Sequence, residues 1–251
     1  MSLLHALALG SGDVVAIVGA GGKTTLVHRL ADEARRAGLR ALATSTTHMG
    51  TLPEAVTGPV VFEAEGGPLP ALADALRRHG RATLLGRRLR EDKLEGVRPE
   101  RVDELASTAD LVLVEADGAR GRSLKLPASH EPVLPRATTL LLVVAALDVL
   151  GAPLDERRVH RPELVAEACG LAGGEPLGPE QVAQALGAAS GYLARVPPRV
   201  RAGVFLNKVE DAATLAAAEW IAARLAPPYA FVAAGSARTG ECRILAPVPS
   251  A

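Results

Sequence analysis

The chain has 251 residues, of which 48% are hydrophobic and 22% charged, and its 28 Lys and Arg residues balance 28 Asp and Glu residues. This length suits one α/β domain with at most a small appendage. A formal net charge of zero and an aromatic content of 2% argue against nucleic acid or an anionic membrane as a partner.

The two cysteines, Cys169 and Cys242, lie far apart and form no CxxC pair. This usage fits a reducing cytosol and argues against a zinc ribbon or a disulfide scaffold. The first residues, MSLLHALALGSGD, lack a basic region and a small-residue cleavage site, so we interpret them as a helical turn or docking segment. Because no apolar run reaches the roughly 18 residues of a membrane helix, we expect a cytoplasmic protein.

Short apolar runs alternate with amphipathic stretches along the chain. The predicted strands occupy residues 13–19, 39–45, 60–64, 82–86, 110–119, 137–145, 201–211 and 229–237. The predicted helices occupy residues 23–38, 68–80, 98–109, 161–170, 178–196 and 212–226. We interpret the charge-rich residues 85–100 as a solvated insertion, and residues 147–200 as a candidate helical subdomain within one domain spanning residues 1–251.

Strands that are continuously apolar, with helices between them, predict a mostly parallel sheet flanked by helices. Ligands bind such sheets at the carboxyl ends of the strands. The segments that carry chemistry in this chain all begin where a predicted strand stops. The order of elements therefore predicts an α/β protein, and the glycine-rich loop after its first strand (residues 19–26) specifies a P-loop NTPase fold.

The segment GAGGKTTL (residues 19–26) lies between a predicted strand and a predicted helix. Glycines let successive backbone N–H groups wrap around phosphates, and the next helix directs its N-terminus at the anion. Lys23 would then reach the β- and γ-phosphates, and the Thr24 hydroxyl would bind Mg²⁺. The segment predicts a nucleotide site; the alternative is a glycine-rich turn with an incidental lysine.

The spacing departs from the usual G-x-x-x-x-G-K-[ST] pattern, because Ile17 stands where the first glycine is expected. Gly19 and Gly21 would supply the flexibility instead. The ending G-K-T-T is similar to that of nitrogenase-iron-protein-like and signal-recognition GTPases, which implies a contact between Thr25 and the α-phosphate. A dinucleotide site is less compatible, because Thr24 occupies the place of the last glycine of its fingerprint.

The segment VLVEADGARGRSLKLPASHEP (residues 112–132) begins as a strand and ends in charged residues. Glu115 and Asp117 are two apart, so on an extended chain both point to the same side, where oxygen ligands suit Mg²⁺. Three cations follow that would stabilise a transferred phosphate or hold an anionic substrate. Two candidate proton-transfer groups come after them. These are Arg120, Arg122 and Lys125, followed by His130 and Glu131. The alternative is an irregular loop with ordinary surface charges.

Two further segments carry weaker signals. TSTTHM (residues 44–49) would complete a Mg²⁺ or γ-phosphate shell, with His48 as a ligand or base, or else form a turn rich in Ser and Thr. His160 and Arg161 would line a substrate cleft, or else belong to a polar linker.

The segment FLNKVED (residues 205–211) resembles the N-K-x-D sequence with which GTPases read guanine. Asn207 and Lys208 match it, but Glu210 stands where the pattern has Asp, which leaves GTP and ATP open. Near the end of the chain, Ser236 lies in a GSAR stretch at the place where GTPases contact the base. The alternative for these residues is an ordinary strand-to-helix turn.

Taken together, the chain resembles the selenium-dependent hydroxylase accessory protein family, of YqeC type. The resemblance rests on GAGGKTT, TSTTHM, VEADGARGRSLKLPASHEP, VHRPE and LNKV. It implies a P-loop protein linked to the maturation of selenium-dependent molybdenum hydroxylases. It also implies an active-site motif around Glu115, Asp117 and the stretch from Arg120 to Lys125. The nucleotide contacts implied are Gly19, Ala20, Gly21, Gly22, Lys23, Thr24 and Thr25.

The leading hypothesis is a Mg²⁺-dependent NTPase for GTP or ATP that assists a molybdenum hydroxylase or a cofactor-maturation protein. Lys23 would neutralise phosphate charge, and Thr24 with Asp117 or Glu115 would hold Mg²⁺. Asp117 or Glu115 would also position the nucleophile, and Arg120 would stabilise the transferred phosphate. The alternatives are a nucleotide-gated chaperone or scaffold without significant turnover, and a small-molecule kinase.

Overall fold

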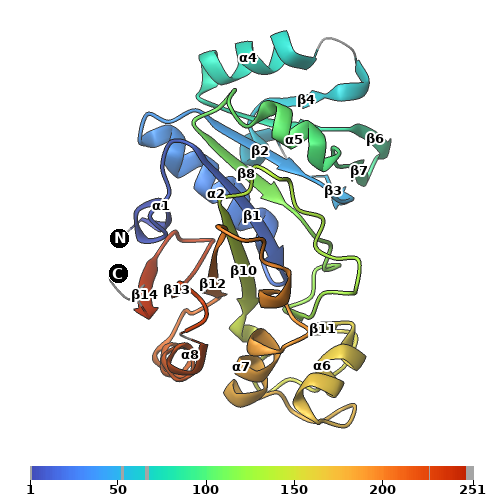
Figure 1. Cartoon of the computed structure of the whole chain (residues 1–251), viewed down its shortest axis with the longest axis vertical. Coiled ribbons are helices and arrows are strands. Elements are labelled where there is room, and N and C mark those ends of the chain that lie inside the picture. Colours follow the sequence, from blue (N-terminus) through green and yellow to red (C-terminus); the bar gives the residue numbers. More distant parts are fainter. Residues whose placement is uncertain (1, 52–53, 66–67, 226, 247–251) are drawn as a thin grey trace.

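A nine-stranded sheet runs through the centre of the molecule (Figure 1). The computed structural model describes residues 2–51, 54–65, 68–225 and 227–246. In spatial order the strands are β14 (Cys242–Ala246), β13 (Phe231–Gly235), β12 (Arg201–Asn207), β10 (Leu140–Ala146), β1 (Asp13–Gly19), β8 (Leu111–Glu115), β2 (Ala41–Ser45), β5 (Arg81–Leu85) and β4 (Val60–Phe62). Only β14 runs antiparallel to its neighbour. The predicted mostly parallel sheet is confirmed.

The central strand β1 is buried on both faces. Val14, Ala16 and Val18 belong to the apolar cluster on one face of the sheet, and Val15 and Ile17 to the cluster on the other. This alternation follows from the two-residue period of a strand. Double burial explains why the strand reads as one continuous apolar run.

Helices cover both faces of the sheet, as expected. On one face lie α1 (Leu3–Ala6) and α2 (Lys23–Arg36), whose leucines pack with those of the central strands. The predicted docking of the first residues is confirmed, because Leu3, Leu4 and Leu7 are buried in this cluster. The other face is covered by α4 (Pro68–His79), α5 (Pro99–Leu105), α6 (Pro162–Cys169), α7 (Pro179–Gly187) and α8 (Ala212–Leu225).

Residues 85–100, predicted to be a solvated insertion, are mostly exposed or half-buried but have regular structure. They form an antiparallel hairpin of β6 (Arg87–Arg90) and β7 (Lys93–Glu95), and β7 also pairs with β3 (Met49–Gly50). Leu94 and Val97 are buried. The predicted exposure holds at residues 87, 88 and 90–92. The hairpin was not predicted, because its charged outward side chains obscure the few apolar positions that anchor it.

Two other boundaries differ from the prediction. The expected helix over residues 178–196 ends at Gly187, and a 3₁₀ turn follows at Leu193–Arg195. Gly187, Ser190 and Gly191 have low helix propensity, which explains the break. The strand expected to reach residue 119 ends at Glu115, so the segment after it leaves the sheet.

The residues between β10 and β12 contain α6 and α7, in the region expected to be helical (Figure 1). A short parallel pair, β9 (Leu124–Lys125) with β11 (Val159–His160), joins this region to the segment after β8. The remaining short elements are α3 (Glu54–Thr57) and 3₁₀ turns at Glu63–Glu65 and Leu147–Val149. None of the helices in the described ranges is long and apolar enough to cross a membrane.

The burial of β10 predicts a large effect of truncating one of its side chains. Leu142 is fully buried in the cluster beneath α2. Leu142→Ala is expected to lower the free energy of unfolding by about 2–5 kcal/mol, because it leaves a cavity in a packed core. Leu69→Ala, at a side chain that is 47% exposed, is the control and should change it by less than about 0.5 kcal/mol. Equal effects in urea denaturation would contradict this assignment of the core.

Candidate functional site

The loop between β1 and α2 has a backbone that only glycine accommodates. Gly19, Gly21 and Gly22 adopt φ angles of +91°, +87° and +114°. A Cβ atom at Gly19 would lie 2.2 Å from the Val144 carbonyl oxygen, and one at Gly21 would lie 2.2 Å from the Ala146 Cβ atom. The loop therefore lies directly against the end of β10.

The loop presents its backbone N–H groups together with the start of a long helix. Within the described part of the chain, the N–H groups of residues 21–25 have no hydrogen-bond acceptor. Unpaired N–H groups and the helix dipole make the N-terminus of α2 a site for an anion. This geometry fits a phosphate group.

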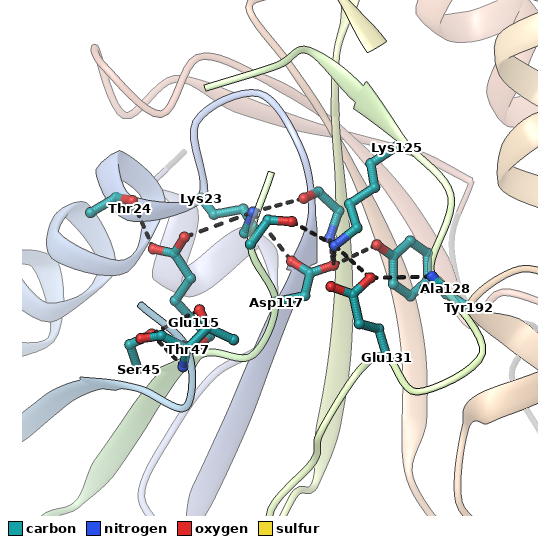
Figure 2. Close-up of polar contacts among 12 residues, drawn as sticks. Lys23, Thr24, Ser45, Thr47, Glu115, Asp117, Lys125, Ala128, Glu131 and Tyr192 are labelled. Carbon is teal, nitrogen blue, oxygen red and sulfur yellow. Dashed lines mark hydrogen bonds and ion pairs between the residues drawn. The ribbon is translucent and has the colours of Figure 1, made fainter. Parts of the chain in front are cut away.

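The Lys23 side chain folds back over the loop (Figure 2). Its ammonium group donates to the Gly19 carbonyl oxygen at 2.7 Å. It lies 3.2 Å from Asp117 Oδ1 and 3.7 Å from Glu115 Oε1. Only 4% of the residue is exposed, so its charge is balanced by these two carboxylates.

Glu115 and Thr24 meet at the edge of a cavity beside the loop. The Thr24 hydroxyl donates to Glu115 Oε2 at 2.7 Å, and both residues line the cavity. Burial raises the pKa of the Glu115 carboxyl above its ordinary value, and the Lys23 charge offsets this only in part. A hydroxyl and a carboxylate side by side suit a hard cation.

Asp117 has different surroundings, although it was predicted to share the role of Glu115. It is fully buried, and its Oδ2 atom accepts from the Gly19 N–H at 3.1 Å and from the Tyr192 hydroxyl at 2.5 Å. The Lys125 ammonium lies 3.0 Å from the same oxygen. The structure places Asp117 beneath the loop, and it is absent from the described residues that line the cavity.

Tyr192 is a contact of the candidate site that sequence reasoning missed. Burial raises the pKa of its hydroxyl well above the ordinary value, and the Asp117 charge acts in the same direction. The hydroxyl therefore stays protonated and donates to Asp117. No local motif marks Tyr192; its role follows from a contact across 75 positions of sequence.

Lys125 and Glu131 form a second layer of charge under the site. Lys125 is 2% exposed, and its ammonium lies 2.9 Å from Glu131 Oε2. Arg161 Nη1 donates to the same oxygen at 2.6 Å. Burial opposes the charged form of Glu131, but the hydrogen bonds from Arg161 and Lys125 outweigh it and lower its pKa to about 2. Lys125 thus binds carboxylates in the interior, while His130 is exposed.

The cavity has a volume of about 760 Å³ and opens beside the N-terminus of α2. The segment after β2 contributes Thr47 and His48, whereas the Thr44 and Ser45 hydroxyls donate to backbone carbonyls. Arg120, which was predicted from sequence, also lines it. Among the described residues, the lining is residues 21–25, 47–50, 90, 92–93, 115, 118–122, 131 and 160–161.

The residues predicted to read a base lie on the other side of the loop. The Asn207 side-chain amide donates to the Gly21 carbonyl at 2.7 Å and accepts from the Ala237 N–H at 2.9 Å. The Ser236 hydroxyl lies 3.4 Å from Glu210 Oε1. Lys208 instead donates to Asp148 at 2.7 Å. Asn207 therefore joins the loop to the segment after β13.

The oxygen donors beside the glycine-rich loop decide whether this site suits Mg²⁺. Among the residues that the structure describes, there is no cluster of three or more His, Cys, Asp or Glu side chains arranged to hold a metal. Mg²⁺ often binds through only one or two carboxylates plus substrate phosphates. Thr24 and Glu115 fit this kind of site, because both reach the cavity beside the phosphate-binding loop.

The parallel sheet, the glycine loop at the end of β1 and the helix that follows it define an α/β protein with the P-loop NTPase fold. The family model described as YqeC protein matches residues 15–163. Over 197 residues the chain is 33% identical to YqeC of Escherichia coli (strain K12), covering 78% of this chain and 75% of that protein. The chain belongs to the YqeC family.

Several solved structures are similar to this chain at low sequence identity. Chloroplast FtsY from Physcomitrella patens is 19% identical with a TM-score of 0.44, over 88% of this chain and 58% of that one. The signal recognition particle receptor FtsY from Elizabethkingia anophelis is 16% identical with a TM-score of 0.43, over 91% and 60%. The chain thus spans less than two thirds of the length of either structure.

The hydrogen bond between Tyr192 and Asp117 predicts a measurable loss on its removal. Tyr192→Phe should lower the free energy of unfolding by about 1.5–3 kcal/mol, because the bond is to a buried charged group. Tyr229→Phe is the matched control: Tyr229 is also buried, but its hydroxyl donates to the neutral Leu186 carbonyl at 2.8 Å. Tyr229→Phe should lower the free energy of unfolding by about 0.5–1.5 kcal/mol. A larger loss for Tyr229→Phe would count against the proposed importance of the Asp117 contact.

The low pKa of Glu131 predicts an acid-dependent stability. Because its pKa is about 2 in the folded protein and 4.5 for an ordinary glutamate, its contribution is complete above pH 4.5 and is lost as pH falls towards 2. Wild type should therefore be more stable than Glu131→Gln at pH 6, and the difference should shrink as the pH is lowered below 4.5. Urea denaturation of both proteins at pH 6, 5, 4 and 3 measures this difference. A difference that stays constant with pH would rule out Glu131 as the titrating group.

Proposed function

We propose that this protein is a cytoplasmic nucleoside triphosphatase that binds GTP or ATP with Mg²⁺. The observation that supports this most directly is the loop at the N-terminus of α2. There, the N–H groups of residues 21–25, the Lys23 ammonium and the Thr24–Glu115 pair surround one edge of a cavity. Phosphoryl transfer needs mainly positioning and charge stabilisation, which these groups supply.

Each group has a defined task in this proposal, and Glu115 has two. The N–H groups bind the β-phosphate, and Lys23 neutralises the charge that develops during cleavage. Thr24 and Glu115 would hold Mg²⁺, which neutralises the phosphate oxygens when bound. Of the two predicted carboxylates, we assign the positioning of the nucleophile to Glu115, because it lines the cavity and Asp117 does not.

The buried network explains how Lys23 can turn towards a phosphate. When its ammonium moves away from Asp117, that carboxylate keeps the Lys125 ammonium, the Tyr192 hydroxyl and the Gly19 N–H. An unpaired buried carboxylate would cost several kcal/mol, on the order of the effective penalty for a buried ion. The remaining partners prevent that cost.

Base recognition is assigned to the loops after β12 and β13. Asn207 would hold these loops against the phosphate loop, while Glu210 and Ser236 would meet the base. Arg238 pairs with Glu210 at 3.1 Å, but the pair is largely exposed and therefore weak. An amino group of the base can displace Arg238 from Glu210. Glu210 is compatible with either GTP or ATP, and a comparison of the two nucleotides would distinguish them.

We assign the biological role to the maturation of selenium-dependent molybdenum hydroxylases or their cofactor. The support for this is the similarity of the central segment VEADGARGRSLKLPASHEP to the hydroxylase accessory family. A small-molecule kinase is the second candidate, and the observation that favours it is the arginine-rich cavity next to the loop.

Binding and turnover of GTP and ATP, each with and without Mg²⁺, test the proposed function. Lys23→Ala should reduce turnover at least tenfold, about 1.4 kcal/mol of transition-state stabilisation. Thr24→Ala should remove the dependence of turnover on Mg²⁺. Thr24→Ser should restore that dependence, because serine keeps the hydroxyl. Arg36→Ala, at an exposed position of α2, is the control for a lost charge on the same helix.

The outcomes separate the candidate functions. If neither nucleotide binds to wild type, the proposal is wrong. Tight binding without turnover would favour a nucleotide-gated scaffold, which a pull-down of client proteins with and without nucleotide would then identify. Transfer of labelled γ-phosphate to a small molecule, and not to water, would favour the kinase.

A further inference from the structure

The cavity beside the phosphate loop extends away from the residues assigned to the base. Those residues follow β12 and β13, which lie beyond β10 on one side of β1. Much of the cavity wall follows β8 and β2, which lie on the other side of β1, and the β6–β7 hairpin completes it. Resting on the proposed function, this order places the cavity next to the terminal phosphate of a bound nucleotide and opposite its base.

The walls of this cavity carry an excess of positive charge. Besides Lys23 and Glu115, its lining holds five cationic side chains and two carboxylates. The cations come from three separate segments: the hairpin, the loop after β8 and the start of α6. They are Arg90, Lys93, Arg120, Arg122 and Arg161, against Asp92 and Glu131. Because the formal net charge of the whole chain is zero, this cavity is a local concentration of positive charge.

Ion pairs account for only part of this charge. Arg90 lies 3.6 Å from Asp92, and Arg161 lies 2.6 Å from Glu131. Across the described ranges, Lys93, Arg120 and Arg122 have no carboxylate partner within ion-pair distance. Lys93 and Arg122 are also half-buried. A half-buried cation without a counter-charge is destabilising, and a bound anion would remove that cost.

Two of the arginines are held in an uncommon backbone conformation. Arg120 has a φ angle of +48° and Arg161 one of +60°. Non-glycine residues in this region cost of order 1–3 kcal/mol each, and they cluster at ligand sites. Both side chains line the cavity. The backbone strain is therefore consistent with a binding role for this wall.

The positive charge of the cavity belongs to arginine and lysine side chains. His160 also lines it, and burial, together with the charges of Lys125 and Arg161, lowers its pKa to about 4. His160 is therefore neutral near pH 7 and can accept or donate a hydrogen bond to a ligand. The volume of about 760 Å³ lies within the range of small-molecule sites.

We propose that this cavity binds a small anionic second substrate, one that carries carboxylate or phosphate groups, beside the terminal phosphate of the nucleotide. The unpaired cations would hold its oxygen atoms, and the hairpin that carries Arg90 and Lys93 would form its outer wall. The protein would then act on two ligands at once, and the second ligand would lie on the side of β1 opposite the base.

The test measures anion binding by isothermal calorimetry with the phosphate loop already filled. Wild type is saturated with Mg²⁺ and a non-hydrolysable triphosphate analogue, and then titrated with inorganic phosphate and, separately, with succinate. The variant Lys93→Gln with Arg122→Gln removes two of the unpaired cations of the cavity wall. The matched control, Arg136→Gln with Arg157→Gln, removes two exposed cations that do not line the described cavity. Circular dichroism confirms that each protein is folded.

Wild type and the control should bind at least one of the two anions, and the cavity variant should bind it at least tenfold more weakly. Equal affinities in all three proteins, or no binding of either anion to wild type, would overturn the second site. Binding of the triphosphate analogue is measured first in the same samples. Failure of that step refutes the proposed function, whereas failure of the anion step alone refutes only this inference.

Discussion

The carboxylate of Asp117, buried beneath the phosphate loop, is the interaction on which the rest of the site depends. A charge without solvent is costly unless it is paired and hydrogen-bonded. Asp117 is stabilised by the Gly19 N–H, the Lys23 and Lys125 ammonium groups and the Tyr192 hydroxyl. These partners come from the end of β1 and the start of α2, from the segment after β8 and from the segment before β12. One buried anion therefore holds three separate parts of the chain together.

This arrangement couples the region that contains α6 and α7 to the phosphate loop. Tyr192 ends that region and donates to the same oxygen that accepts from Gly19. Glu131 extends the coupling, because it pairs with both Lys125 and the cavity residue Arg161. A ligand that moves Lys23 or Arg161 would change the balance of charge around Asp117 or Glu131. The cavity and the loop are thus joined by a contiguous chain of ion pairs and hydrogen bonds.

The order of strands divides the functional end of the sheet into two halves. Parallel strands bring their carboxyl ends to one edge, where the loops after them can meet a ligand. The loops after β12 and β13 gather Asn207 and Ser236 on one side of the phosphate loop. The loops after β2 and β8, with the β6–β7 hairpin, form the cationic cavity on the other. The phosphate loop lies between them because β1 is the central strand.

The sequence predicted the core strands and helices and the glycine-rich loop, because burial periodicity and glycine-rich turns are local signals. It also placed Glu115 and Asp117 at the end of one strand. The different surroundings of the two carboxylates, with Glu115 at the cavity and Asp117 buried beside Tyr192, became visible only in the tertiary structure. The tertiary structure also decided that the charged residues 87–95 form a hairpin that completes the cavity. These features depend on the order of strands and on contacts between distant segments, neither of which a local pattern encodes.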